Sequence, residues 1–213
     1  MNIKAVFFLN KSKKYNINCN YKQLSIYICK YMASSDRIIL DPKQFELTIK
    51  RLSHQLIENY GDFKDTVIIG LQPRGYFLAE RIHQELMKID AKLNIKLGSL
   101  DVTFYRDDFR RQDAPIIPNK TEINFIIEDK KVILIDDVLF TGRTIRSGLD
   151  AMLAFGRPKT VELLVLINRR YKRDLPIQAD YIGKNVHSIV SERVKVNWKN
   201  IDKEDKVILY TPE

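Results

Sequence analysis

Cysteine and histidine are scarce in this chain of 213 residues, which contains two cysteines, Cys19 and Cys29, and three histidines. No CxxC pair or Cys/His metal spacing exists, so neither a structural zinc site nor a disulfide framework is predicted. The sequence also lacks any run of 18 apolar residues, and the early apolar run at residues 5–9 is too short for a signal-peptide core. We therefore expect a cytoplasmic protein with no membrane partner.

Acidic residues are absent from positions 1–31, which carry six lysines (4, 11, 13, 14, 22 and 30) and account for most of the net charge of +9. The remaining 182 residues hold 30 basic and 27 acidic side chains, so their charge alone predicts no RNA or membrane partner. Two interpretations of residues 1–31 stay open. They form a basic N-terminal extension with little structure, or they are not part of the native protein, which then begins at Met32.

The rest of the chain, residues 32–213, alternates strand and helix patterns and is expected to form one domain. A helix should begin after Asp41, a capping residue followed by Pro42 and Gln44, and end at Gly61. Further helices are predicted at residues 76–88 and 144–155. Strands are predicted at residues 66–70, 95–105, 131–135, 161–167, 180–182, 194–198 and 206–210. Because the main strands are apolar on both faces, a mostly parallel sheet covered by helices is expected.

Residues 106–122 interrupt this alternation with a polar, proline-bearing and aperiodic stretch. Long loops without regular structure are uncommon inside compact domains and usually serve a function. We expect a flexible loop here.

The stretch KVILIDDVLFTGRT, residues 131–144, carries the strongest chemical signal. Its strand ends in Asp136 and Asp137, and the loop Val138, Leu139, Phe140, Thr141, Gly142, Arg143 and Thr144 leads into a helix. Free N–H groups at a helix start bind phosphate, and the threonines and the arginine add donors. The carboxylates would repel a phosphate but accept hydrogen bonds from hydroxyls, so a ribose 5-phosphate fits the whole stretch. The alternative is a capped turn with two solvated acids.

Other nucleotide-binding motifs are absent. Gly70 and Gly75 have the spacing of a Walker loop, but Tyr76 and Phe77 follow where lysine and a hydroxyl residue are needed. The sequence contains no GxGxxG, and no Ser/His/Asp or Cys/His set is evident for nucleophilic catalysis.

The string VILIDDVLFTGRT resembles the phosphoribosyl pyrophosphate (PRPP) signature of type I phosphoribosyltransferases. More closely, the chain is similar to the PyrR family, uracil phosphoribosyltransferases that in some bacteria also regulate pyrimidine genes by binding mRNA. IIGLQPRGYFLAERI, LGSLDVTFYRDDFR, LPIQADYIGKN and SERV match in order and spacing over about residues 38–210. The resemblance implies a parallel sheet flanked by helices, with a small hood and a flexible loop. It also implies conversion of uracil and PRPP to UMP and pyrophosphate, Mg²⁺ bound with PRPP, and a homo-oligomer.

The resemblance also assigns roles to single residues. Asp136 and Asp137 would hold the ribose as catalytic residues, and residues 138–144 would bind the phosphate. Pro73, Arg74 and Gly75 resemble the pyrophosphate loop, and Arg106 opens the flexible loop. Arg169 and Val194 fall where the family's hood covers the base.

The hood segment departs from the family. It reads NRRYKRDLP where relatives usually have Asp-Arg-Gly-His-Arg-Glu-Leu-Pro, so Asn168 replaces the usual aspartate. The candidates for an mRNA leader surface are Arg51, His54, Arg173 and Lys184, whereas Gln178 stands where mRNA-binding members tend to carry arginine. Three hypotheses stay open: an active uracil enzyme, a nucleotide-sensing regulator without turnover, and a phosphoribosyltransferase for another base.

Overall fold

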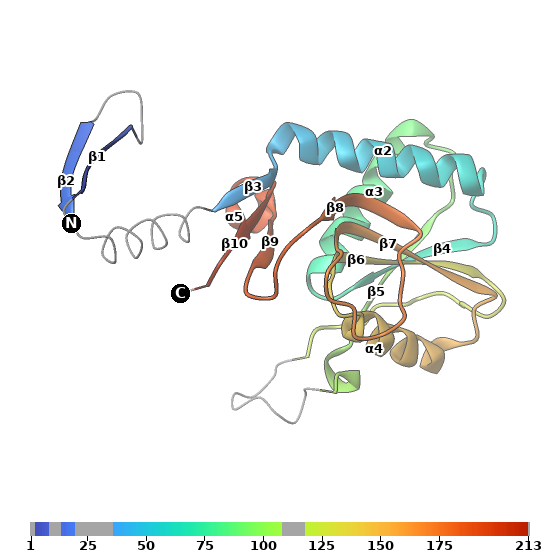
Figure 1. Ribbon diagram of the computed structural model, residues 1–213. Helices are drawn as coiled ribbons and strands as arrows, with labels where there is room; N and C mark the ends of the chain where they lie inside the picture. Colours follow the sequence, from blue (N-terminus) through green and yellow to red (C-terminus); the bar gives the residue numbers. More distant parts are fainter. Residues whose placement is uncertain (1–2, 9–13, 20–35, 108–117, 213) are drawn as a thin grey trace.

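The computed structural model describes residues 36–107 and 118–212 in full, and residues 3–8 and 14–19 as backbone (Figure 1). The strands are β1 (Ile3–Phe8), β2 (Lys14–Cys19), β3 (Arg37–Leu40), β4 (Thr66–Leu71), β5 (Lys96–Leu100), β6 (Lys131–Leu139), β7 (Thr160–Arg169), β8 (Tyr181–Val186), β9 (Arg193–Asn197) and β10 (Lys206–Tyr210). The helices are α2 (Pro42–Tyr60), α3 (Arg74–Ile89), α4 (Arg143–Met152) and the short α5 (Lys199–Asp202). No helix in these described ranges is long and apolar enough to cross a bilayer.

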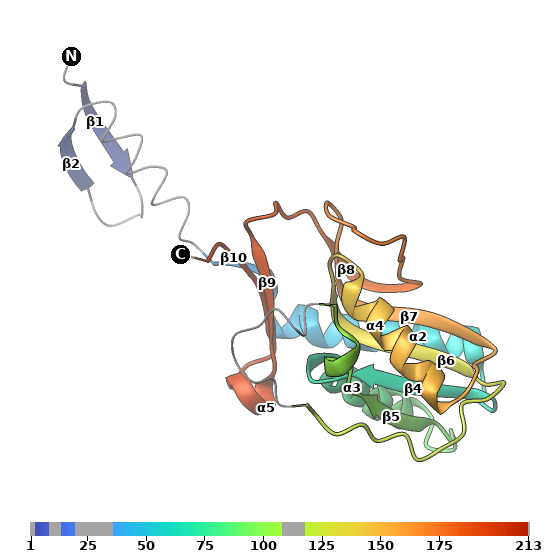
Figure 2. The ribbon, with the colours of Figure 1, turned by 90° about the horizontal axis from the view of Figure 1, so that it is seen from below.

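A five-stranded parallel sheet in the order β5-β4-β6-β7-β8 forms the centre of the fold. Helices α2 and α3 cover one face and α4 covers the other, as Figures 1 and 2 show. The predicted α/β class and parallel sheet are therefore confirmed. The central position of β6, between β4 and β7, places the residues that follow Ile135 in the middle of the sheet's carboxyl edge.

A second, antiparallel sheet in the order β3-β10-β9 joins the two ends of the domain. Trp198, which follows β9, is buried and contacts Phe45 of α2 edge-on, with ring centroids 5.4 Å apart, and Phe77 of α3 at 6.0 Å. These contacts fix the small sheet against α2 and α3. We call β3, β9, β10 and residues 187–192 the hood.

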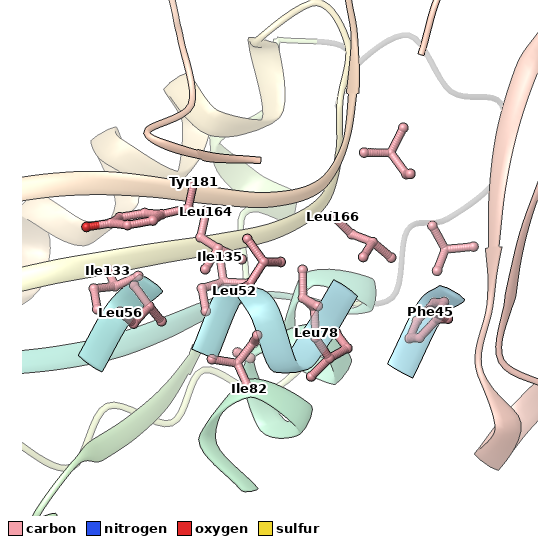
Figure 3. Close-up of a cluster of buried hydrophobic side chains, with 14 of the residues drawn as sticks. Phe45, Leu52, Leu56, Leu78, Ile82, Ile133, Ile135, Leu164, Leu166 and Tyr181 are labelled. Carbon is pink, nitrogen blue, oxygen red and sulfur yellow. The ribbon is translucent and has the colours of Figure 1, made fainter. Parts of the chain in front are cut away.

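The larger core cluster lies between α2, α3 and the central sheet (Figure 3). Leu52 and Leu56 of α2 and Leu78 and Ile82 of α3 are fully buried. Figure 3 shows them directed toward the side chains of β6 and β7. Helix α2 has the predicted start, because Asp41 accepts a hydrogen bond from Gln44 N at 2.8 Å and Gln44 Oε1 accepts one from Asp41 N at 3.3 Å.

Several predicted boundaries were wrong, and the strand predicted at residues 180–182 in fact runs from Tyr181 to Val186. The strand predicted at residues 95–105 ends at Leu100, because Asp101 accepts hydrogen bonds from Thr103 and bends the chain into a 3-10 turn. Strand β6 continues to Leu139, because β7 pairs with it well beyond the predicted end. Helix α4 stops at Met152 and tightens into a 3-10 turn before Gly156.

Two further expectations concern the loops. Helix α3 already begins at Arg74, so Gly75 is a helical residue and not a loop residue. Its missing side chain allows the helix to pack closely against β6. Most of the predicted flexible loop, residues 108–117, lies outside the described residues. Its end is ordered, because Glu122 pairs with Ser99 at the edge of β5.

Residues 1–31, for which the sequence predicted no helix or strand, contain two strands. Strands β1 and β2 pair in antiparallel fashion, from Ile3 opposite Cys19 to Phe8 opposite Lys14.

The core predicts a clear contrast between two leucines of α2. Replacing Leu52, which is fully buried, by alanine should lower the free energy of unfolding by about 2–5 kcal/mol. The same change at Leu47, which is 57% exposed, should have little effect. Urea unfolding of both variants measures the difference. Equal losses would contradict the assigned orientation of α2.

Candidate functional site

The two carboxylates lie inside β6 and are buried, with Asp136 7% and Asp137 9% exposed. Strand β6 is apolar from Val132 to Ile135, so the acids are its first polar groups toward the carboxyl edge of the sheet. This is the edge at which open parallel sheets bind ligands. Asp136 Oδ1 accepts a hydrogen bond from Asp137 N at 2.9 Å, so the two residues also constrain each other.

Both carboxyl groups have raised pKa values, and different neighbouring charges act on each of them. Burial raises the pKa of Asp137 to about 6, against the opposing positive charge of Arg74 and the backbone N–H of Val138. Burial and then the charge of Asp137 raise the pKa of Asp136 well above its ordinary value, and Arg106 partly opposes this. The pair can therefore hold a proton at a pH where ordinary carboxylates are ionised.

A cavity of about 660 Å³ opens beside Asp136. Its lining comprises Arg106, Asp107, Asp136, Val138, Leu139, Phe140, Thr141, Gly142, Arg143, Thr144, Ile145 and Ser147. Every member of the predicted loop 138–144 is in this set. Asp137 is not, so the structure brings only one of the two acids to the cavity wall.

The N-terminus of α4 forms one end of this cavity. Gly142 caps the helix with φ of +91°, a left-handed conformation that glycine adopts without strain. The first N–H groups of a helix have no partner within it and attract anions. Thr141, Gly142 and Thr144 therefore surround a site suited to a phosphate, which we call the cradle, residues 141–144.

The predicted pyrophosphate loop lies against the same strand. A Cβ at Gly75 would fall 2.6 Å from Ile135 O and 2.9 Å from Asp136 Cα, so only glycine allows this approach. Arg74 donates to Val196 O of the hood at 2.6 Å and lies close enough to Asp137 to affect its titration. Pro73 precedes α3 directly. None of the three lines the cavity beside Asp136.

Ion pairs surround the cradle. Arg143 contacts Asp107 through Nη1 and Asp174 through Nε, the latter at 3.2 Å. The structure thus joins the start of the predicted flexible loop, the cradle and the chain after β7. Arg106 lines the cavity from the loop side.

Arg169, predicted for the hood, is the last residue of β7 and is buried. It donates to Ser188 Oγ at 2.8 Å, to Glu192 O at 2.8 Å and to Ile189 O at 3.2 Å. Its guanidinium also lies 3.7 Å from the ring centroid of Phe140, so it links the hood to the loop before the cradle. Val194 is half-buried in β9 and packs on the main core, outside the cavity lining.

The candidate RNA-binding residues do not form one group. Arg51 and His54 lie on α2, and Arg51 donates to Ile182 O and Gly183 O, next to Lys184 of β8. Lys184 itself donates to Ile39 O at 2.8 Å. Arg173 instead lies beside the cavity, where it donates to Phe140 O and Asn168 Oδ1.

Sequence reasoning missed Asp107, Ile145 and Ser147 as cavity residues. Ser147 could have been found, because it is three residues after Thr144 on a predicted helix and therefore shares its face. Asp107 had no such signal, since its place depends on the ion pair with Arg143.

Comparison with known proteins agrees with this geometry. The family model described as a phosphoribosyl transferase domain matches residues 36–201. The chain belongs to this phosphoribosyltransferase family. It is 43% identical to the "Bifunctional protein PyrR" of Haemophilus ducreyi, covering 82% of this chain and 96% of the relative. It is 45% identical to the protein of that name from Clostridium kluyveri, covering 81% and 96%.

Solved structures share the fold at lower identity. The hypoxanthine phosphoribosyltransferase of Trypanosoma cruzi superposes with a TM-score of 0.63 at 16% identity, covering 84% of this chain and 98% of that one. The hypoxanthine phosphoribosyltransferase of Staphylococcus aureus gives 0.61 at 18% identity, with coverage of 86% and 96%. The predicted type I phosphoribosyltransferase fold is confirmed.

The raised pKa of Asp137 predicts a stability effect with a definite sign. In the unfolded chain the carboxyl titrates near its ordinary value of 3.8, and in the folded protein near 6. The folded state therefore binds more protons between these values, so stability falls as pH rises through this window. Asp137→Asn should raise the free energy of unfolding of the ligand-free protein at pH 7.5 by about 3 kcal/mol, and by much less at pH 4.

The control is Asp65→Asn, because Lys130 at 2.7 Å lowers the pKa of that exposed carboxyl. This variant should gain no stability at either pH. Urea unfolding at both pH values provides the comparison. An Asp137→Asn protein that is less stable than wild type at pH 7.5 would contradict the assigned burial cost.

Proposed function

We propose that the protein transfers the phosphoribosyl group of PRPP to uracil, which forms UMP and pyrophosphate. One observation carries this proposal: a single cavity joins a buried carboxyl, Asp136, to a phosphate cradle at the start of α4. A ribose 5-phosphate has the matching chemistry, with an anion at one end and a diol next to it. The relatives named "Bifunctional protein PyrR" and the sequence resemblance favour uracil as the base.

In this proposal the cradle takes the 5-phosphate through N–H groups at the start of α4 and the hydroxyls of Thr141 and Thr144. Asp136 accepts hydrogen bonds from the ribose hydroxyls. Asp137 beside it adds a second carboxyl group near the ribose ring. Pro73, Arg74 and Gly75 lie next to β6, where the pyrophosphate would extend. Arg106 adds positive charge at the mouth of the cavity.

The reaction makes a bond from N1 of uracil to C1 of the ribose and breaks the bond from C1 to the pyrophosphate oxygen. The bonding electrons leave with pyrophosphate, and the N1 proton of uracil goes to solvent or to a nearby base. The ribose becomes cation-like in the transition state, so an ionised carboxylate near the ring stabilises it. The cradle contributes by holding C1 in line between the base and the leaving group.

Magnesium fits this site as a partner of the substrate. Among residues 36–107 and 118–212, no group of three or more His, Cys, Asp or Glu side chains is arranged to hold a metal. Mg²⁺ would be held by oxygens of the substrate's pyrophosphate and ribose, with few direct protein ligands. When bound with PRPP, Mg²⁺ neutralises charge on the pyrophosphate.

Further parts of the proposal rest on the family resemblance. We propose that residues 32–213 form the functional domain, with residues 1–31 as an extension outside it, and the family match begins at residue 36. A homo-oligomer of at least two chains and a cytoplasmic location follow from the same resemblance.

Incubation with PRPP, Mg²⁺ and each base in turn tests the activity. UMP should form from uracil, and no nucleotide should form from hypoxanthine or guanine. Asp136→Asn and Asp137→Asn should each reduce kcat by at least about 100-fold, because the amide cannot stabilise a cationic ribose. Asp65→Asn should retain full activity. Near-normal turnover by the Asp136→Asn enzyme would refute the ribose assignment, and product from no base would favour a sensor without turnover.

A second function, binding of an mRNA leader, is favoured by the name of the relatives and by the grouping of Arg51, His54 and Lys184 where α2 meets β8. Phosphate contacts by such residues would make binding sensitive to salt.

A gel shift with the organism's own pyrimidine leader RNA tests this function, with UMP present and absent. His54→Glu should weaken binding severalfold without changing UMP synthesis. Lys92→Glu, an exposed change near the end of α3 that alters the charge at least as much, is the control and should have little effect. The absence of any uridine-nucleotide-dependent shift for the unmodified protein would rule the function out.

A further inference from the structure

Residues 173–177, which we call the strap, follow β7 and lie directly against the cradle. A Cβ added to Gly142 would be 3.3 Å from Ile177 Cδ1 and 3.5 Å from Leu175 Cβ. The strap thus forms the outer wall of the glycine at the helix start. It comes from the segment in which this chain departs from the family.

The strap also binds the two backbone carbonyls that precede Gly142. Asp174 N and Leu175 N both donate to Thr141 O, at 3.0 and 3.2 Å. The Arg173 guanidinium donates to Phe140 O through Nη1. The loop before α4 has no ladder partner after Leu139, so these donors replace the strand bonds that end there.

These bonds fix the direction of the N–H groups that face the ligand. A peptide unit is planar and trans, so its C=O and N–H point in opposite directions. When Arg173 holds Phe140 O toward the strap, it turns Thr141 N–H away from the strap. The bonds to Thr141 O do the same for Gly142 N–H. The strap therefore orients two N–H groups of the cradle before a phosphate arrives.

Arg173 is itself anchored to the central sheet. Its Nη2 donates to Asn168 Oδ1 of β7 at 2.7 Å, and Asn168 Nδ2 donates to Asn185 Oδ1 of β8 at 2.8 Å. Arg169 also contacts Phe140, because its guanidinium stacks on the Phe140 ring. The Phe140 residue is thus held at both its carbonyl and its ring.

We propose that Arg173 is a positioning residue that preorganises the phosphate cradle by holding Phe140 O through a chain of hydrogen bonds to Asn168 and Asn185. The inference rests on the proposed function for the identity of the ligand. It gives Arg173 a role in substrate binding, in place of the RNA contact that the sequence suggested. Residues 168–176, which the family resemblance places over the base, are by this account also the support of the 5-phosphate site.

The test compares Arg173→Met with Arg170→Met. Arg170 is exposed in the same segment, so its replacement removes the same charge without touching the cradle. Arg173→Lys is the second variant, because lysine keeps the charge but cannot bridge Phe140 O and Asn168 Oδ1 with one planar group. Each protein is measured for ribose 5-phosphate affinity by calorimetry, for the KM values and kcat of the reaction, for leader RNA binding by gel shift, and for thermal unfolding.

Arg173→Met should raise the Kd for ribose 5-phosphate and the KM for PRPP by about 10- to 100-fold, the effect of losing a hydrogen bond from a charged group. The KM for uracil and kcat should change little, because the cradle binds the phosphate equally in the ground and transition states. Arg173→Lys should fall between wild type and Arg173→Met, and Arg170→Met should match wild type.

Three results would overturn the proposal. Ribose 5-phosphate affinities of the Arg173 variants equal to that of Arg170→Met would remove the positioning role. A lower melting temperature with lower kcat but unchanged affinity would assign Arg173 to stability alone. Loss of leader RNA binding with unchanged affinity for ribose 5-phosphate would restore the RNA assignment. If the unmodified protein binds ribose 5-phosphate but forms no nucleotide, the proposed enzyme activity fails while this inference can still be decided by affinity.

Discussion

Burial of two adjacent carboxyl groups within β6 is the constraint on which the rest of the structure depends. Asp136 and Asp137 are each less than 10% exposed, and burial raises the pKa of both. Such an arrangement costs free energy of folding unless a ligand or a cation later uses the charge. The surrounding features offset part of this cost, since Arg74 and Arg106 bring positive charge to the pair. The buried acids therefore lower the stability of the fold, and they place two carboxyl groups close to the anion-binding start of α4.

Close packing around β6 brings distant parts of the chain to this point. Gly75 lets the start of α3 lie against Ile135 and Asp136, and Gly142 lets the strap lie against the start of α4. The buried Arg169 ties the hood to Phe140. The regions expected to bind pyrophosphate, 5-phosphate and base are therefore joined by direct contacts around β6.

Local patterns were sufficient to predict much of this arrangement. The capping residues of α2, the apolar strands and the loop 138–144 each carry short-range signals, and all of that loop lines the cavity. Long-range contacts could not be predicted in this way. Arg173 meets Phe140 across 33 positions of sequence, and its own charge suggested a surface role. Asp136 and Asp137 have the same predicted role. Successive side chains in a strand point to opposite faces, however, and of the two only Asp136 lines the cavity.

The most direct measurement of the central claim is a crystal structure of the protein with UMP bound. The account predicts the 5-phosphate within hydrogen-bonding distance of the N–H groups of residues 141–144. It also predicts the ribose hydroxyls at Asp136, with the carbonyl of Phe140 still bonded to Arg173. A phosphate bound elsewhere, or a ribose directed away from β6, would contradict the claim that this cavity is built for a ribose 5-phosphate.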